Sequence, residues 1–419
     1  HRAGLLDTLE LQEALKEIDA ALQIDSNYVD AYREQASIYY NHDKFIEAVN
    51  SMSKAIELDS LNEDFYFSRA FIFKEMDSII LAAKDFEKVI GLDPEDLEAY
   101  YNLGVIHCEN GLNEDALMDF EKVLEIDSTY VNAINYIGTI YEDLGIIDLA
   151  IKTYERGIAL EQTDPLAAAY CYSNRATIYE TQEEFEQALS DYTKAIALDP
   201  ENPLRYELRA NFYDQLGEDE ENPALIDYSR AIELDKENPE RWADRAEFHY
   251  YAGHDQDAIQ DYKKVLELDS TNIDAINTIG LIYVEQGKID LAIQTYERGI
   301  AFEKTDPIAA SYCYRNRGII YRNQEKYQKA IDDFTKTIEL DPNTASRYID
   351  RANCYRDMNE NEKALEDYNM AIEIDPTGSY NWFSRGAFFN LVNNDKDAIN
   401  DLEKSISLNP SDIDNYIWL

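Results

Sequence analysis

Apolar residues are spaced along this chain as they are on one face of an α-helix, and the same pattern returns at a nearly fixed distance. Within each repeat they fall at i, i+4 and i+7, which is helical spacing. One alanine marks the pattern twelve times, with steps of 34 residues except for single steps of 38, 36 and 38. These alanines are Ala14, Ala48, Ala82, Ala116, Ala150, Ala188, Ala224, Ala258, Ala292, Ala330, Ala364 and Ala398. A fixed period of this length predicts an all-α chain built from one repeated unit.

Two further positions predict how the helices of a unit meet. With the marker alanine counted as position 20, position 8 is always alanine or glycine and position 24 is large in most units. A small side chain at position 8 lets two helix backbones approach closely, and the large side chain fills the space between them. The residues at position 8 are Ala36, Ala70, Gly104, Gly138, Ala176, Ala210, Ala246, Gly280, Gly318, Ala352 and Gly386. Each unit is therefore predicted to hold two closely packed helices, here called helix A and helix B.

This pattern of small and large positions resembles the tetratricopeptide repeat, whose 34-residue unit is a pair of antiparallel helices. The resemblance covers almost the whole chain and implies an all-α tetratricopeptide solenoid, a right-handed superhelix of antiparallel helix pairs. The expected division is a partial unit with helix B at 1–28, units 1 to 4 at 29–168, units 5 to 8 at 169–310, units 9 to 11 at 311–412, and the start of a further helix A at 413–419. Because both ends stop inside a unit, we expect either a longer protein or another element that covers the ends.

A longer period lies over the short one. The run TYERGIA at 153–159 returns at 295–301, and Tyr-Cys-Tyr at 170–172 returns at 312–314, an offset of 142 residues. Both units of 38 residues obey this offset, which indicates that a block of four hairpins was duplicated. Their four-residue additions contain Asp164-Pro165 and Asp306-Pro307, a cap and first turn that should make the next helix A start early.

Arginine at position 7 and aspartate at position 23 occur together in seven units. The pairs are Arg69 with Asp85, Arg175 with Asp191, Arg209 with Asp227, Arg245 with Asp261, Arg317 with Asp333, Arg351 with Asp367 and Arg385 with Asp401. The two positions lie on facing helices, so we predict an ion pair between helices A and B of each unit. Shared ancestry of the units would produce the same association. One unit departs from the association, because it has Leu103 at position 7 and Asp119 at position 23.

Composition restricts the partners. The chain has 38 Lys and Arg against 85 Asp and Glu, a net charge of −47. A field of this sign repels phosphate backbones and anionic lipid, which excludes nucleic acid and favours a protein or peptide partner with basic character, although a solvated acidic surface explains the same excess. No apolar stretch reaches the roughly 20 residues of a membrane-spanning helix, so we expect no membrane insertion. Cysteine usage slightly favours the cytoplasm, and a periplasmic or exported location requires that a leader was removed.

The sequence predicts no catalytic, cofactor-binding or metal-binding residues. Its five histidines form no HExxH or comparable pattern, no glycine-rich phosphate loop occurs, and no stretch has calcium-loop spacing. Four cysteines form no CxxC pair. His107 and His249 occupy position 11, where a packed core side chain is expected.

The resemblance also implies where a partner would bind, because positions 2, 5, 9 and 12 of helix A line the concave groove of tetratricopeptide arrays. The groove residues predicted to contact a partner are Tyr40, Tyr101, Tyr170, Glu207, Glu240, Glu247, Tyr250, Tyr312, Arg315, Arg322, Arg356 and Tyr380. Tyrosine is favoured at such sites because it offers a large, rigid contact. Packing of these tyrosines against the adjacent helix A is the alternative, as is simple solvation for the acidic residues.

Chaperone-binding members of the family grip a terminal carboxylate with Lys and Asn residues at fixed groove positions. Only Asn174 and Asn316 match that set, so a clamp for the C-terminal carboxylate of a chaperone is not expected. The sequence thus predicts a non-catalytic scaffold or adaptor that binds a protein or peptide in its groove. A recruiting or regulatory arm of an enzyme whose catalytic domain lies outside this chain is the alternative, and a spacer with no groove ligand is a third possibility.

Overall fold

The computed structural model describes residues 2–217 and 223–411, with side chains from residue 11 onward, and the only regular elements in these ranges are α-helices. They are α1 (Arg2–Ile24), α2 (Val29–Tyr40), α3 (Phe45–Leu58), α4 (Glu63–Glu75), α5 (Ile79–Leu92), α6 (Leu97–Glu109), α7 (Asn113–Ile126), α8 (Val131–Asp143), α9 (Ile147–Ile158), α10 (Pro165–Thr181), α11 (Phe185–Leu198), α12 (Pro203–Leu216), α13 (Pro223–Leu234), α14 (Pro239–Tyr251), α15 (Asp255–Leu268), α16 (Ile273–Glu285), α17 (Ile289–Ile300), α18 (Pro307–Asn323), α19 (Tyr327–Leu340), α20 (Ala345–Asp357), α21 (Asn361–Ile374), α22 (Ser379–Leu391) and α23 (Asp395–Leu408).

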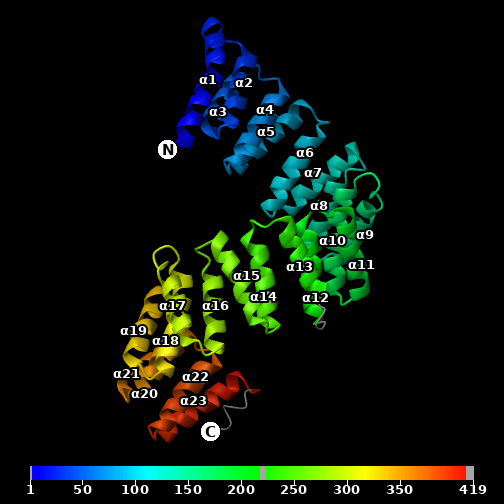
Figure 1. The fold of residues 1–419 in the computed structure, drawn as a ribbon. Coiled ribbons are helices and arrows are strands. Elements are labelled where there is room, and N and C mark those ends of the chain that lie inside the picture. Colours follow the sequence, from blue (N-terminus) through cyan, green and yellow to red (C-terminus); the bar gives the residue numbers. More distant parts are fainter. Residues whose placement is uncertain (1, 218–222, 412–419) are drawn as a thin grey trace. The chain divides into compact units, whose positions relative to one another are not determined.

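The helices form two compact units, residues 1–215 and 216–419. Within each unit, consecutive helices pair as hairpins and the hairpins follow one another in sequence order (Figure 1). The expected fold class, an all-α tetratricopeptide solenoid, is confirmed. The expected start of a further helix A at 413–419 lies outside the described residues.

The marker alanines lie where the helices of a hairpin touch. Eleven of the twelve have at most 2% of their surface exposed, from Ala48 to Ala398. Ala14, in α1, is exposed. The buried cores run along each unit from hairpin to hairpin, as in the cluster that joins Met52, Phe73 and Phe86 in unit 1.

In four hairpins, position 8 carries glycine where the facing aromatic ring leaves no room for a methyl group. A Cβ added at Gly138 would overlap the ring of Tyr154, and one at Gly280 would overlap Tyr296, both of which are fully buried. The glycine of the repeated TYERGIA run, Gly157, is constrained in the same way, because a Cβ there would meet Sγ of Cys171 in the next hairpin. These glycines therefore set the distance between helices.

The turn between helices A and B has a feature that the sequence reading missed. In all eleven hairpins, position 15 adopts a positive φ, between 54° and 74°. Glycine, which adopts this conformation without strain, occupies five of these turns. The other six hold Asp43, Asp77, Glu183, Glu325, Asn359 and Asn393. This left-handed residue ends each helix A and turns the chain back into helix B.

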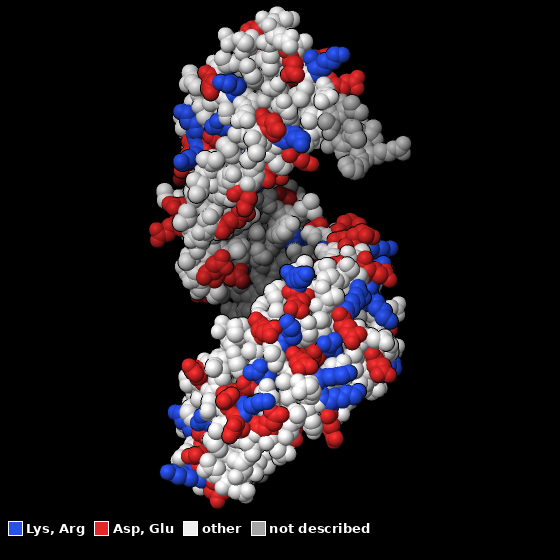
Figure 2. Space-filling model, turned by 90° about the vertical axis from the view of Figure 1, so that its left-hand side faces the viewer, with Lys and Arg blue, Asp and Glu red and all other residues white. Residues whose placement is uncertain are grey.

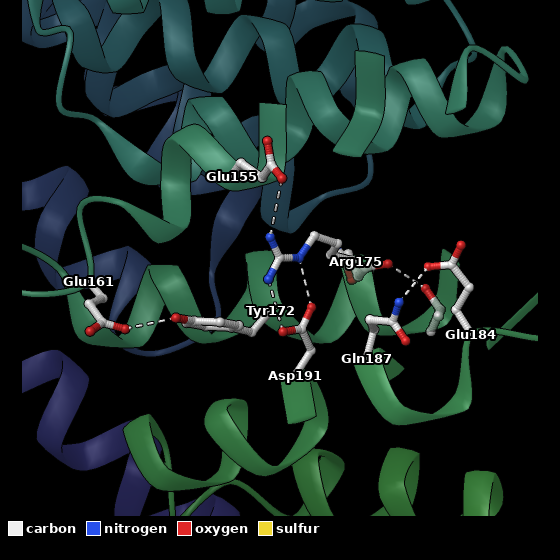
Figure 3. Close-up of polar contacts among 9 residues, drawn as sticks. Glu155, Glu161, Tyr172, Arg175, Glu184, Gln187 and Asp191 are labelled. Atoms are coloured by element: carbon white, nitrogen blue, oxygen red, sulfur yellow. Dashed lines mark hydrogen bonds and ion pairs between the residues drawn. The ribbon is translucent and has the colours of Figure 1, made fainter. Parts of the chain in front are cut away.

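Six of the seven predicted arginine–aspartate pairs are ion pairs within a single unit of the structure. Figure 3 shows Arg175 of α10, whose Nε donates to Oδ2 of Asp191 on α11 at 2.7 Å, with Nη2 donating to Oδ1 at 2.9 Å. Nη1 of the same arginine lies 3.8 Å from Glu155. The other five pairs are Arg69–Asp85, Arg245–Asp261, Arg317–Asp333, Arg351–Asp367 and Arg385–Asp401, with shortest distances of 2.7–2.8 Å. Arg209 with Asp227 spans the boundary between the units and stays a prediction.

The aspartate that lacks an arginine has a histidine instead. Nδ1 of His107, on α6, lies 2.7 Å from Oδ2 of Asp119 on α7. Burial raises the pKa of Asp119, and the hydrogen bond from His107 acts in the opposite direction. Position 11 of helix A therefore replaces position 7 as the partner of this aspartate, which explains the exception at Leu103.

We predict that Gly138→Ala destabilises the chain by about 1–3 kcal/mol, because the new methyl group must displace the buried Tyr154 ring. Urea unfolding followed by circular dichroism measures the effect. Gly91→Ala is the matched control, because a Cβ there has nothing within 4 Å and alanine raises helix stability by up to about 1 kcal/mol. Equal effects of the two substitutions would contradict the steric role of Gly138.

A double-mutant cycle on Arg245 and Asp261 should give a coupling energy of about 1–3 kcal/mol. The two side chains are 19% and 5% exposed, and Ser229 accepts a further hydrogen bond from Arg245 at 3.0 Å, so either single substitution leaves a buried polar group unpaired. Lys264 with Glu267, an exposed pair at 2.9 Å, should couple by about 0.5 kcal/mol or less. A coupling for Arg245 and Asp261 no larger than this control rejects the bridge.

Candidate functional site

An aromatic pocket opens at the first two hairpins of unit 1. Its volume is about 490 Å³ and it lies between α2 and α4. The lining residues are Arg33, Glu34, Ala36, Ser37, Tyr40, Met52, Phe67, Ser68, Phe71 and Ile72. Five of them, at positions 5, 9 or 12 of helix A, belong to the set that the tetratricopeptide resemblance places in the groove.

The floor of this pocket is apolar and its rim is polar. Met52 and Ile72 are buried beneath it, whereas Arg33 and Glu34 are exposed. Phe71 keeps 36% of its surface exposed although it packs on Phe67 with ring centroids 5.1 Å apart. An exposed phenylalanine on a concave surface is suited to an apolar side chain of a partner.

Phe67 and Phe71 were not predicted from the sequence, because only tyrosines and charged residues were considered at the groove positions. Both occupy positions 5 and 9 of the second hairpin, so their spacing alone could have found them. Tyr40, which was predicted, lines the same pocket. Burial is the first cause that raises the pKa of Tyr40, and the nearby carboxylate of Glu75 is the second.

The other predicted tyrosines lie in different surroundings. Tyr101 is half-buried among the rings of Phe120, Tyr130 and Tyr136, with centroids 5.0–6.0 Å apart in this cluster. Burial raises its pKa strongly. The alternative considered for the tyrosines, packing against an adjacent helix A, describes Tyr101, because Tyr136 belongs to α8.

Tyr170, Tyr312 and Tyr380 are exposed, whereas Tyr250 is half-buried. The hydroxyl of Tyr250, on α14, donates to Oε1 of Glu285 at 3.3 Å. Tyr170, Tyr312 and Tyr380 are 40%, 47% and 58% exposed. Their rings are therefore accessible from solvent.

None of the predicted acidic residues lines the aromatic pocket. Glu240 and Glu247 are exposed on α14 in unit 2, and Glu207 is half-buried on α12. After burial, Glu247 and Glu240 are the largest causes that raise the pKa of Asp244. Arg241, on the same helix, lowers the pKa of Asp244 and so opposes them.

The predicted basic residues are ion-paired. Nε of Arg315 donates to Asp350 at 2.6 Å, and Nε of Arg322 donates to Asp357 at 2.9 Å, both from α18 to α20. Arg356 also donates to Asp357, at 2.7 Å. Figure 2 shows Lys and Arg interspersed with Asp and Glu over the visible face of unit 2, in agreement with such pairing. The sequence reading missed these contacts because their aspartates lie outside the four groove positions.

In the described ranges, no group of three or more His, Cys, Asp or Glu residues is arranged so that it could hold a metal ion. Burial raises the pKa of Cys171 and Cys313 to about 12, which keeps both thiols protonated at neutral pH. The amide of Asn174, one of the two clamp matches, donates to Asn135 at 3.0 Å. Among the described helices, none has both the length and the apolar character needed to cross a bilayer.

Comparison with known families places these features in one class. Models described as "Tetratricopeptide repeat" match residues 81–131, 169–202, 273–306, 311–344 and 345–377, in both units. The chain therefore contains tetratricopeptide repeats in both units. Such arrays present extended surfaces for contact with other proteins.

Among curated proteins, the chain is similar to the Protein STIP1 homolog of Dictyostelium discoideum, with 33% identity over 93 residues, which are 21% of this chain and 16% of that protein. It is also similar to the Photosystem I assembly protein Ycf3 of Prochlorococcus marinus (strain MIT 9215), with 30% identity over 84 residues, 19% of this chain and 46% of that protein. The chain thus spans less than half the length of either relative.

Among solved structures, yeast Tom70 aligns over 94% of each chain with 15% identity and a TM-score of 0.43. The APC/C hetero-tetramer Cut9-Hcn1 aligns over 100% of this chain and 94% of that chain, with 14% identity and a TM-score of 0.41.

The buried side chain of His249 should make the stability of the chain depend on pH. Burial is the main cause that lowers its pKa below 6.5, with smaller contributions from Arg245 and His254, while Asp261 and Asp257 raise it. The unfolded chain therefore takes up this proton first, so stability is complete above pH 6.5 and falls as the pH drops below it. We predict that His249→Phe reduces this loss between pH 7 and 5, measured by urea unfolding at each pH.

The exposed His254 supplies the control for that experiment. His254→Gln should leave most of the loss below pH 6.5 in place. A His249→Phe variant with the same pH dependence as the unmodified chain would show that His249 is not the group responsible.

Proposed function

We propose that this chain is a non-catalytic scaffold or adaptor that holds a protein or peptide partner on the groove formed by its A helices. The observation that carries the proposal is the aromatic pocket of α2 and α4. It combines a volume of about 490 Å³ with an exposed phenylalanine, Phe71, and a polar rim. Pockets of this size and lining bury apolar groups of a ligand and orient them with a few polar contacts.

The names of the similar proteins support this class of function. One relative is named as an assembly protein of photosystem I. Proteins that assemble others need extended contact surfaces more than reactive groups. The ion-paired arginines and protonated buried thiols described above are consistent with such a role.

The partner segment is proposed to be basic and to carry an apolar side chain. The net charge of −47 attracts a basic segment and repels an acidic one. The arginines of α18 and α20 do not oppose this preference strongly, because Asp350 and Asp357 accept hydrogen bonds from them. The apolar side chain would enter the aromatic pocket, and the net negative charge of the chain would attract the basic residues of the segment.

Affinity capture from the native source tests the proposal with the Phe71→Ser variant. The substitution removes an exposed ring from the pocket without removing a fully buried side chain, so the fold should persist. We expect partners retained by the unmodified chain to be depleted about tenfold or more by Phe71→Ser. Their binding should also weaken as the salt concentration rises, because Debye screening reduces attraction to the acidic surface.

Ile80→Ser is the matched control, because Ile80 is 76% exposed on α5, a B helix, and does not line the pocket. It should retain the same partners as the unmodified chain. Identical sets of partners on all three proteins would reject the groove as the binding surface.

A further inference from the structure

The block of four hairpins that is duplicated in the sequence gives each compact unit one copy of the same feature, a long A helix. Helices α10 and α18 have 17 residues, longer than every other A helix, because each begins one turn early at a proline. Asp164 and Asp306 cap these extra turns by accepting hydrogen bonds from Ala167 and Ala309, both at 3.0 Å. The early start that the sequence predicted is confirmed.

In both units, the groove tyrosine on the long helix lies over a buried arginine of the next hairpin. The guanidinium carbon of Arg205 is 3.9 Å from the ring centroid of Tyr170, and that of Arg347 is 4.8 Å from Tyr312. Arg205 and Arg347 are only 1% and 3% exposed. Each tyrosine therefore covers a charge that would otherwise face the groove.

The partners of Arg205 explain why the ring is needed there. Its Nε donates to Asp199 at 3.3 Å and its Nη1 to Ser173 at 3.2 Å, but its Nη2 has no hydrogen-bond partner among the described residues. A buried cation with incomplete hydrogen bonding is costly, and the face of an aromatic ring offsets part of that cost. Arg347 is similar but not identical: its Nε lies 3.5 Å from Oδ2 of Asp341 and has no hydrogen-bond partner among the described residues.

The outer faces of both rings remain exposed beside a second apolar residue. Leu166 and Ile308, one helical turn before the tyrosines, are 57% and 50% exposed. The hairpin core does not require an apolar side chain at these exposed positions, yet the pattern of residues is the same in both copies of the block. The stacked arginine fixes each ring before a ligand arrives, which reduces the entropy lost on binding.

We propose that Tyr170 with Leu166 in unit 1, and Tyr312 with Ile308 in unit 2, are two equivalent sites for the same kind of partner segment. The segment is extended, carries a leucine-like or phenylalanine-like side chain, and has lysine or arginine beside it. The cation beneath each ring draws electron density to the inner face, so the outer face favours an apolar group over a second cation. The basic neighbours follow from the net charge of −47.

This inference rests on the proposed function and specifies it further, because it assigns two sites with one ligand chemistry to a single chain. A partner that contains two such segments would engage both sites of one molecule. Its affinity would then exceed that of either segment alone through effective concentration.

Displayed random peptides of about 12 residues test the inference on the full-length chain. Peptides are selected on the Tyr170→Ala variant, which keeps only the second site, and binders to the Tyr170→Ala/Tyr312→Ala double variant are removed. The remaining peptides are synthesised and titrated by calorimetry into the unmodified chain and into each variant. We expect a bulky apolar residue next to Lys or Arg in these peptides.

We also expect two peptides to bind each unmodified chain with affinities within about tenfold of one another, and one peptide to bind Tyr170→Ala or Tyr312→Ala. The double variant should lose about tenfold or more in affinity. A peptide that survives the counter-selection but does not bind Tyr312→Ala, which keeps only the first site, would overturn the equivalence. Failure to recover any peptide after the counter-selection would overturn it as well.

Two controls separate binding from folding. Tyr170→Phe and Tyr312→Phe keep the stacked ring and should keep binding, and Leu166→Ser and Ile308→Ser alter exposed residues and should weaken it. Ile80→Ser should have no effect. If the unmodified chain selects peptides that all these variants bind equally, the proposed scaffold function stands and the two-site inference fails. If the unmodified chain selects none, both fail.

Discussion

The close approach of two helices at one small residue is the contact on which the rest of the structure depends. In the hairpin of α8 and α9, Gly138 lies against the fully buried ring of Tyr154, and the same contact recurs between Gly280 and Tyr296 in the duplicated block. Close packing of this kind tolerates little change in volume. It fixes how helix A lies on helix B, and therefore which residues of helix A are left to face the groove.

The ion pairs between helices A and B depend on the same close approach of the two helices. Facing helices at a fixed distance bring arginine at position 7 within reach of aspartate at position 23, and six such bridges are formed with both side chains largely buried. The hairpin of α6 and α7 reaches the same end with His107 and Asp119. Many arginines of this acidic chain thus pair with aspartates and join neighbouring helices. The acidic residues that exceed these pairs are left for the surface.

Much of the fold could be predicted from the sequence because the repeat is strict. The spacing of the alanines indicates a repeated helical unit, and the small residues at position 8 allow two helices to approach closely. The Asp-Pro pairs before α10 and α18 make those helices begin early. The positive φ at position 15 escaped prediction because six different turns achieve it with Asp, Glu or Asn in place of glycine. The partner of Asp119 escaped it because the search compared only positions 7 and 23.

The candidate site could be predicted only in outline. The list of groove positions found Tyr40, but it passed over Phe67 and Phe71, which complete the same pocket. Arg315 and Arg322 were also predicted to be unpaired charges. Their aspartate partners lie on α20, and the ion pairs become evident only when α18 and α20 are placed side by side. Likewise, the exposure of Tyr170 and Tyr312 follows from the sequence pattern, but the buried arginine beneath each ring does not.

The central claim is that partners contact the A helices at the groove and not the B helices. Photo-crosslinking tests it most directly, with a benzophenone-bearing amino acid placed at Ser37, on the pocket rim, or at Ile80, on the exposed surface of α5. We expect a crosslink to the captured partner from Ser37 and none from Ile80. A crosslink from Ile80 with none from Ser37 would contradict it.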